Sequence, residues 1–253
     1  MAQKWASGYA LRWTPILTFT KRRLRLLDWF EQHTEPVSFY EDPETVGIAL
    51  VDPGLRLTLN RDGMRISANA ADLDLDHLSP AVQGVFEVMA PQDAVLETAM
   101  STWTLELDGA DYNEARALAA CRMSGVDRVL EDGSFRAVDG SALVDFESTE
   151  AIVQLEWGIV EAAEFVERLK DPRLGRHSGV IRPPHADRMP DHLPDVAMLA
   201  DVLVRRRVGG QVGSARNLME RVWEADRVAS MIATSVYEGH WKGKGTDEFA
   251  QIG

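Results

Sequence analysis

The chain has few of the features that mark secreted or membrane-spanning proteins. Its 253 residues include a single cysteine, Cys121, so no disulfide can form within the chain. No N-x-S/T acceptor occurs, and no uncharged apolar run approaches the roughly 18 residues that a membrane span requires. Arg12 interrupts the apolar N-terminal stretch and no small-residue cleavage site follows it, so we expect no signal peptide. Together these absences predict a cytoplasmic protein that does not contact membranes.

The common catalytic and cofactor motifs are also missing. The sequence contains no serine-nucleophile elbow, zinc signature, kinase motif set or phosphate-binding G-x-x-x-x-G-K-[ST] loop. The glycines at 209, 210 and 213 follow no predicted strand and do not fit the dinucleotide-binding pattern. We therefore predict no cofactor.

Positive charge is scarce, and the negative charge is unevenly distributed. Forty acidic residues outnumber 27 basic ones, which gives a formal net charge of −13. Residues 91–150 hold 13 acidic and 4 basic side chains, whereas residues 181–253 hold 10 of each. An acidic surface repels phosphates and anionic lipids, so this balance disfavours nucleic-acid and membrane partners. The acidic sector is either a solvated face or a face for a basic partner.

Apolar and turn patterns predict a mixed fold in the first half of the chain. A strand over residues 8–19 and a helix from Thr20 to His33 precede three short strands that Pro-Gly and Asp-Gly turns separate. A helix then begins at Ser79-Pro80. The three predicted strands are Val46–Val51, Leu55–Asn60 and Met64–Ala68.

The same order of patterns recurs in the second half. A strand over 95–107 leads to a helix over 111–124, three further strands and a long helix over 149–170. These strands are Val126–Leu130, Phe135–Val138 and Ala142–Phe146. We predict an α+β fold of duplicated β-α-β-β-β-α units, with antiparallel sheet or sheets covered by helices. Residues 1–90 and 91–170 form the two predicted repeats.

Two segments follow the predicted repeats. Residues 171–195 contain five prolines among Arg, His and Asp, and we interpret them as an extended arm. Residues 196–253 are predicted to form a C-terminal helical segment packed on the core. It comprises one helix over 195–207 and a longer one from Ser214 to Tyr237.

The arm contains the residues best suited to acid–base or metal chemistry. His177, His185 and His192 lie near Asp191, and imidazole and carboxylate groups together can transfer protons or bind metal. Their spacing matches no helix-borne metal motif. The alternative is that these side chains are solvated loop residues.

Arginine clusters and tryptophans near the chain ends are the candidate interaction residues. They are Arg22 and Arg23, the run Arg205, Arg206 and Arg207, and Trp13 and Trp241. We hypothesise a non-catalytic interaction protein that binds a protein partner or associates with itself. One alternative is a small-molecule or anion binder in the junction between the repeats. Another is a metal- or His/Asp-dependent hydrolase that uses residues 177–195.

Overall fold

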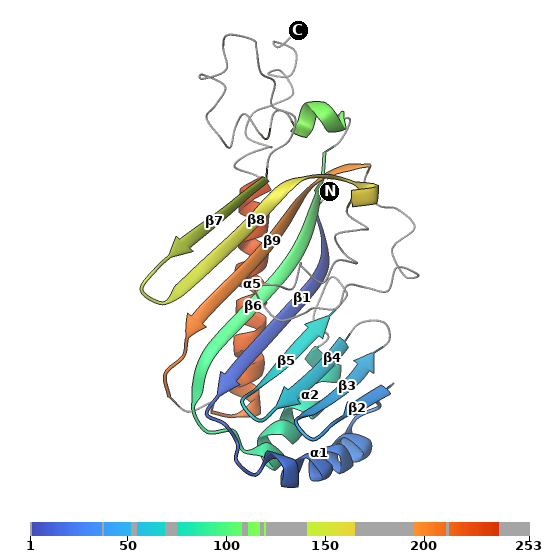
Figure 1. Cartoon of the computed structure of the whole chain (residues 1–253), viewed down its shortest axis with the longest axis vertical. Coiled ribbons are helices and arrows are strands. Elements are labelled where there is room, and N and C mark those ends of the chain that lie inside the picture. The colour runs from blue at the N-terminus through green and yellow to red at the C-terminus, as the bar shows by residue number, and fades with distance from the viewer. Residues whose placement is uncertain are drawn as a thin grey trace.

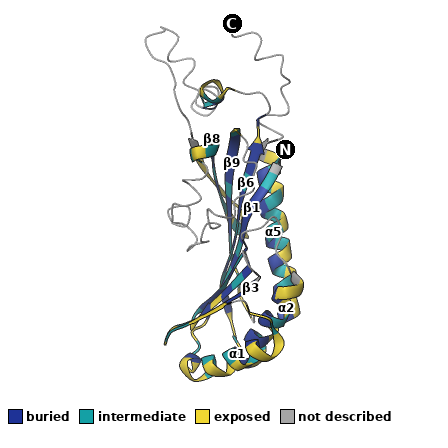
Figure 2. Cartoon of the chain, turned by 90° about the vertical axis from the view of Figure 1, so that its right-hand side faces the viewer, coloured by how far each residue is buried: buried dark blue, intermediate teal, exposed yellow. Residues whose placement is uncertain are grey.

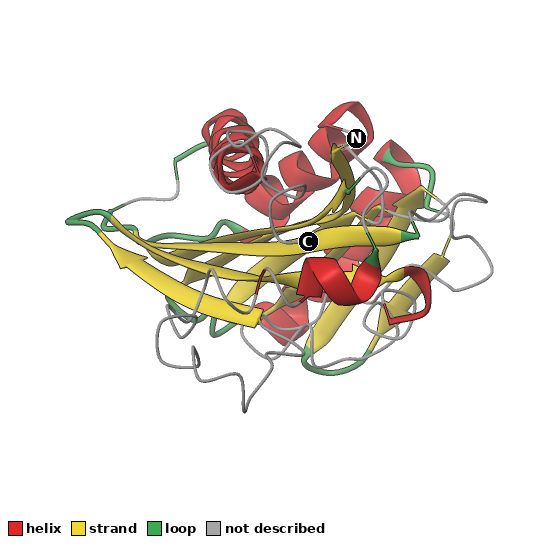
Figure 3. Cartoon of the chain, turned by 90° about the horizontal axis from the view of Figure 1, so that it is seen from above, coloured by secondary structure: helices red, strands yellow, loops and turns green. Residues whose placement is uncertain are grey.

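One nine-stranded antiparallel sheet dominates the structure (Figure 1). The computed structural model describes residues 2–36, 38–51, 55–68, 75–107, 111–116, 119, 141–164, 195–210 and 213–237. The strand order is β2-β3-β4-β5-β1-β6-β9-β8-β7, and the sheet twists from one edge to the other (Figure 3). The fold is therefore mixed helix and strand, as the sequence predicted.

The N-terminal half supplies five neighbouring strands and two helices. Their order along the chain is β1 (Ala2–Trp13), α1 (Phe19–His33), β2 (Ser38–Glu41), β3 (Thr45–Val51), β4 (Leu55–Asn60), β5 (Gly63–Ala68), α2 (Leu75–Gly84) and the π-helical turn η1 (Val85–Met89). The antiparallel β3-β4-β5 meander confirms the prediction for these residues.

Alternation of buried and more exposed residues explains why β4 is readily predicted from the sequence. Leu55, Leu57 and Leu59 are buried. The residues between them are more exposed, because successive strand side chains point to opposite faces of a sheet.

The C-terminal half continues the sheet from β1. Its elements are β6 (Ala94–Glu106), β7 (Ser141–Glu147), β8 (Ala151–Glu161), β9 (Val196–Arg207) and α5 (Ala215–Tyr237). Strand β6 pairs with β1 on one side and with β9 on the other. The two halves are therefore joined by continuous backbone hydrogen bonding.

The helices α1, α2 and α5 lie on one face of the sheet (Figure 2). Helix α5 crosses β1, β6 and β9, and its residues Leu218, Val222, Ala225, Ala229 and Ala233 are buried. Ser214 caps this helix, as predicted, because its hydroxyl accepts a hydrogen bond from the N–H of Asn217 at 3.2 Å. The largest fully buried side chains of the core are Tyr9, Phe19, Phe30, Leu11, Leu26, Leu57, Leu59, Ile66, Leu78, Met89, Leu105 and Met198.

Two polar contacts are enclosed on the helix-covered face. The Lys4 ammonium, 4% exposed, lies 2.6 Å from the Asp226 carboxylate of α5. The Tyr9 hydroxyl donates to the buried Glu97 carboxylate of β6 at 2.6 Å. The first contact ties α5 to the sheet, and the second ties β1 to β6.

Two predicted helices are strands, so those predictions were wrong. Residues predicted as the helix over 149–170 include β8, and the predicted helix over 195–207 is β9. Both strands lie inside the sheet and have stretches buried on both faces, such as Trp157–Val160 and Ala197–Ala200. A continuous apolar run lacks the two-residue alternation that separates a strand from a helix.

The structure does not confirm the duplicated unit. The helix that should close the second repeat is β8, and the predicted strands Val126–Leu130 and Phe135–Val138 lie outside the described residues. Strand β7 confirms the prediction for Ala142–Phe146.

Several helix and strand boundaries also differ from those predicted. Strand β1 ends at Trp13, before Pro15, and α2 begins at Leu75, so that Pro80 lies inside it. The short strand β2 was not predicted, and a strand does precede the glycines at 209 and 210. None of the described helices is long and apolar enough to cross a membrane.

We expect Asp226→Asn to lower the free energy of unfolding by about 3 kcal/mol, because it leaves the Lys4 ammonium buried without a carboxylate. Urea denaturation followed by circular dichroism measures this change. Glu224→Gln is the matched control on α5, since the Glu224–Arg227 pair is exposed and its loss should leave stability nearly unchanged. Equal effects of the two substitutions would contradict this role of Lys4.

Tyr9 should make stability fall at high pH. Burial and the neighbouring Glu97 carboxylate raise the pKa of Tyr9 well above its ordinary value. Above about pH 10 the unfolded chain therefore loses this proton while the folded chain keeps it, so the free energy of unfolding decreases as pH rises. Tyr9→Phe should make that decrease shallower in denaturation curves between about pH 9 and 11, and parallel curves for the two proteins would argue against it.

Candidate functional site

The sheet face opposite α1, α2 and α5, here called the open face, carries a row of small side chains at its centre. In β1 the residues that point to this face are Ala6, Gly8, Ala10 and Arg12. Their neighbours in β6 include Leu96, Thr98 and Met100, which are partly exposed. Small residues in β1 leave the longer side chains of the flanking strands to define the surface.

Arginines from four strands project onto the open face. Arg56 lies on β4, Arg65 on β5, Arg12 on β1, and Arg205 and Arg207 on β9. Cross-strand register places Leu96 between Arg12 and Arg207 in one row, and Thr98 next to Arg205 in the following row. A protein with a net charge of −13 therefore collects positive side chains in the middle of this face.

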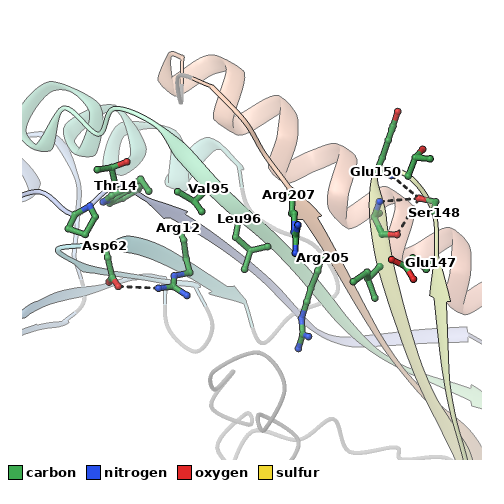
Figure 4. A pocket seen from close by; sticks show the side chains of 15 residues that line it. Arg12, Thr14, Asp62, Val95, Leu96, Glu147, Ser148, Glu150, Arg205 and Arg207 are labelled. Carbon is green, nitrogen blue, oxygen red and sulfur yellow. Dashed lines mark hydrogen bonds and ion pairs between the residues drawn. The ribbon is translucent and has the colours of Figure 1, made fainter.

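A hollow of about 800 Å³ lies over this junction between β1, β6 and β9 (Figure 4). Its walls are the end of β1 with the following Thr14-Pro15, the β4–β5 turn at Asp62, and the hairpin between β7 and β8. Arg12, Arg205 and Arg207 lie at its centre, and Glu147 and Glu150 lie on the hairpin side. The hollow thus has a cationic floor and a partly acidic rim.

Arg12 is held only loosely. Its guanidinium lies 3.4 Å from Asp62, and the two side chains are 64% and 37% exposed. Exposed ion pairs contribute little to stability, so an incoming anion can replace Asp62 at small cost. On the hairpin, the Ser148 N–H donates to the Ala151 carbonyl at 2.9 Å, which fixes the shape of the opposite wall.

Arg65 is a partly buried cation on this face. Burial lowers the pKa of Arg65, and its Nε–H is buried without a hydrogen-bond partner. An unsatisfied buried donor costs free energy, whereas a guanidinium that stays protonated keeps its attraction for anions. Arg65 sits directly beside Ala10 of β1, so it extends the cationic surface beyond the hollow.

The predicted run Arg205, Arg206 and Arg207 is divided between the two faces because it lies on a strand. Arg205 and Arg207 line the hollow, while Arg206 pairs in register with Glu97 and lies on the helix-covered side. A helix would have placed the three arginines along one turn. The structure therefore brings only two of them to the same site.

Arg22 and Arg23 have structural partners. Arg22 donates to the Met89 carbonyl at 2.6 Å, which satisfies the end of η1. Arg23 donates to the Asp42 carbonyl and lies 3.2 Å from the Glu41 carboxylate. These contacts join α1 to η1 and to the β2–β3 turn.

Of the remaining predicted candidates, Trp13 lines the hollow where β1 ends. Trp13 is 2% exposed, and its indole N–H donates to the Arg61 carbonyl at 3.3 Å. Trp241 and the arm residues His177, His185, Asp191 and His192 lie outside the described residues. Within the described ranges, no group of three or more His, Cys, Asp or Glu side chains could hold a metal ion.

Sequence reasoning missed Arg12, Arg56 and Arg65. A signal existed for Arg56, because it is a polar residue between buried leucines of an alternating strand. No comparable signal existed for the grouping, since the arginines are brought together only by strand register.

Similarity to known proteins adds no information about this site. No protein-family model matches the chain, and no curated protein is significantly similar to it.

The cations of the hollow should be dispensable for folding. We expect Arg12→Ala to change the free energy of unfolding by no more than about 0.5 kcal/mol, because the Arg12–Asp62 pair is exposed. Thermal and urea denaturation measure this. A loss several times larger would mean that Arg12 supports the β1–β5 pairing rather than a binding surface.

Proposed function

We propose that this chain is a non-catalytic interaction protein whose hollow on the open face binds an acidic segment of a protein partner. The observation that carries the proposal is the placement of Arg12, Arg205 and Arg207 in one hollow of an otherwise acidic protein. Arginine forms paired hydrogen bonds with carboxylates and is enriched at protein interfaces.

The geometry of the hollow suits an elongated anionic ligand. Arg12 and Arg207 are two strands apart, which corresponds to about 10 Å between their backbones. Leu96 between them is partly exposed and offers an apolar contact. Two guanidinium groups separated by an apolar side chain favour a ligand with at least two carboxylates and some apolar surface.

The side chains at the centre of the hollow favour binding over catalysis. Arginine stays protonated throughout the physiological pH range, so Arg12, Arg205 and Arg207 are poor proton acceptors. Their fixed charge instead attracts an acidic segment and speeds its encounter with the surface. The partner in this proposal is either another protein or an acidic segment of a second copy of this chain.

A small anion with several carboxylates is a second candidate ligand. The same two arginines flank Leu96 from opposite halves of the chain, so a compact anion bound here would bridge the β1–β6 junction. This corresponds to an anion binder in the junction between the halves. Competition between a peptide and citrate distinguishes the two ligands.

Charge reversal in the hollow tests the proposal. A fluorescein-labelled peptide of alternating Glu and Ser should bind the full chain. Arg12→Glu with Arg207→Glu should weaken the affinity at least about tenfold, because two ion pairs become repulsive. The matched control is Arg216→Glu with Arg227→Glu on α5, which makes the same charge change on the other face. Fluorescence anisotropy measures both.

The expected control result is an affinity close to that of the natural sequence. Equal weakening by both double substitutions would mean that net charge alone attracts the peptide and would refute the proposal. No binding of the peptide would refute it as well. Binding of citrate in preference to the peptide would favour the small-anion candidate.

A further inference from the structure

Strand β7 forms one edge of the described sheet. Its seven residues pair with β8 in an unbroken register, and no described strand lies beyond it. Natural edge strands are commonly protected by charged side chains, lysine above all, or by proline, a bulge or short length, and the charged residues of β7 are Asp145 and Glu147. The segment Ser141–Glu147 contains neither lysine nor proline, and its pairing has no bulge.

The main chain of β7 can pair with another strand. The Ser148 N–H donates to the Ala151 carbonyl at 2.9 Å, so the main-chain groups of Ser148 point toward β8. Hydrogen-bonding direction alternates along an antiparallel pair. Leu143, Asp145 and Glu147, at odd positions, therefore present their N–H and C=O groups to the free edge.

The side chains of β7 differ in character between the two faces. Val144 and Phe146 point to the helix-covered side, opposite Leu155 and Val153 of β8, and are 36% and 51% exposed. Asp145 and Glu147 point to the open face and are exposed. The helix-covered side of the edge is thus apolar, and the open face carries the two carboxylates together with the exposed Leu143.

We propose that β7 accepts an extended segment of a partner protein as a tenth strand, in which apolar residues alternate with lysine or arginine. Residues of the added strand on the helix-covered side would contact Val144 and Phe146. Those on the open face would lie beside Asp145 and Glu147. Main-chain hydrogen bonds supply affinity in such strand addition, and the alternating side chains supply specificity.

Charge favours this partner over a second copy of the chain. If two β7 strands paired around a twofold axis, both copies would bring Asp145 and Glu147 to the same face of the joined sheet. Like charges on neighbouring strands are unfavourable, whereas a basic strand neutralises them. The other sheet edge, β2, is only four residues long.

This surface shares Glu147 with the rim of the hollow but not the arginines of its floor, and it prefers the opposite charge. The two proposals therefore fail or succeed separately. A basic peptide that binds β7 should be insensitive to the Arg12→Glu, Arg207→Glu double substitution, apart from a general effect of net charge that the α5 double substitution also produces.

The test uses a labelled peptide of alternating Val and Lys together with a peptide of identical composition in scrambled order. We expect the full chain to bind the alternating peptide more tightly. Asp145→Lys should weaken that binding about fivefold or more and should create binding of an alternating Val and Glu peptide. Glu44→Lys, an exposed charge reversal in the β2–β3 turn, is the control and should change neither affinity.

A second variant tests the main-chain contribution. Leu143→Pro removes an N–H that points to the free edge. It removes no hydrogen bond to β8, so the variant should fold but should no longer bind the peptide. Circular dichroism confirms folding. Equal binding of the two Val and Lys peptides, or no effect of Asp145→Lys, would overturn the proposal. So would a dimer in sedimentation experiments that Leu143→Pro dissociates, because it would identify a second copy as the occupant of β7.

Discussion

The pairing of β1 with β6 is the interaction on which the remaining structure depends. It joins the N-terminal strands to the C-terminal strands over nearly the full length of both, and a bulge between Lys4 and Ala6 is built into it. Because of that bulge, Lys4 reaches Asp226 on the helix-covered side, while Trp5 donates to Thr104 of β6 at 2.6 Å. The placement of α5, the buried Tyr9–Glu97 contact and the open face all follow from this central register.

The two faces of the sheet separate stability from recognition. One face buries most of the large apolar side chains under α1, α2 and α5, and a smaller buried cluster of Trp5, Val160, Ala197 and Leu199 lies on the other face. The other face leaves exposed or half-buried arginines at the centre and acidic residues near β7. Charged residues on the open face can therefore be substituted with little loss of stability, because the helices pack on the other face.

Sequence reasoning succeeded where polar and apolar residues alternate and failed where they do not. The alternating leucines of β4 and the Asp-Gly turn after it are local signals, and the β3-β4-β5 meander was predicted from them. Strands β8 and β9 contain apolar runs buried on both faces, which are equally compatible with a helix. Of the residues that line the candidate site, Trp13, Arg205 and Arg207 were predicted, and their grouping with Arg12 was not, since it depends on contacts between distant segments.

The sequence by itself determined the mixed class of the fold, the meander, the long C-terminal helix and the acidic balance of the chain, because each depends on neighbouring residues or on composition. Only the tertiary structure decided that one sheet contains all nine described strands, that Arg206 lies on the other side from Arg205 and Arg207, and that β7 is an edge of the described sheet. The physical reason is that strand pairing joins residues far apart in the chain. A shift of one residue in register would move every side chain of a strand to the opposite face.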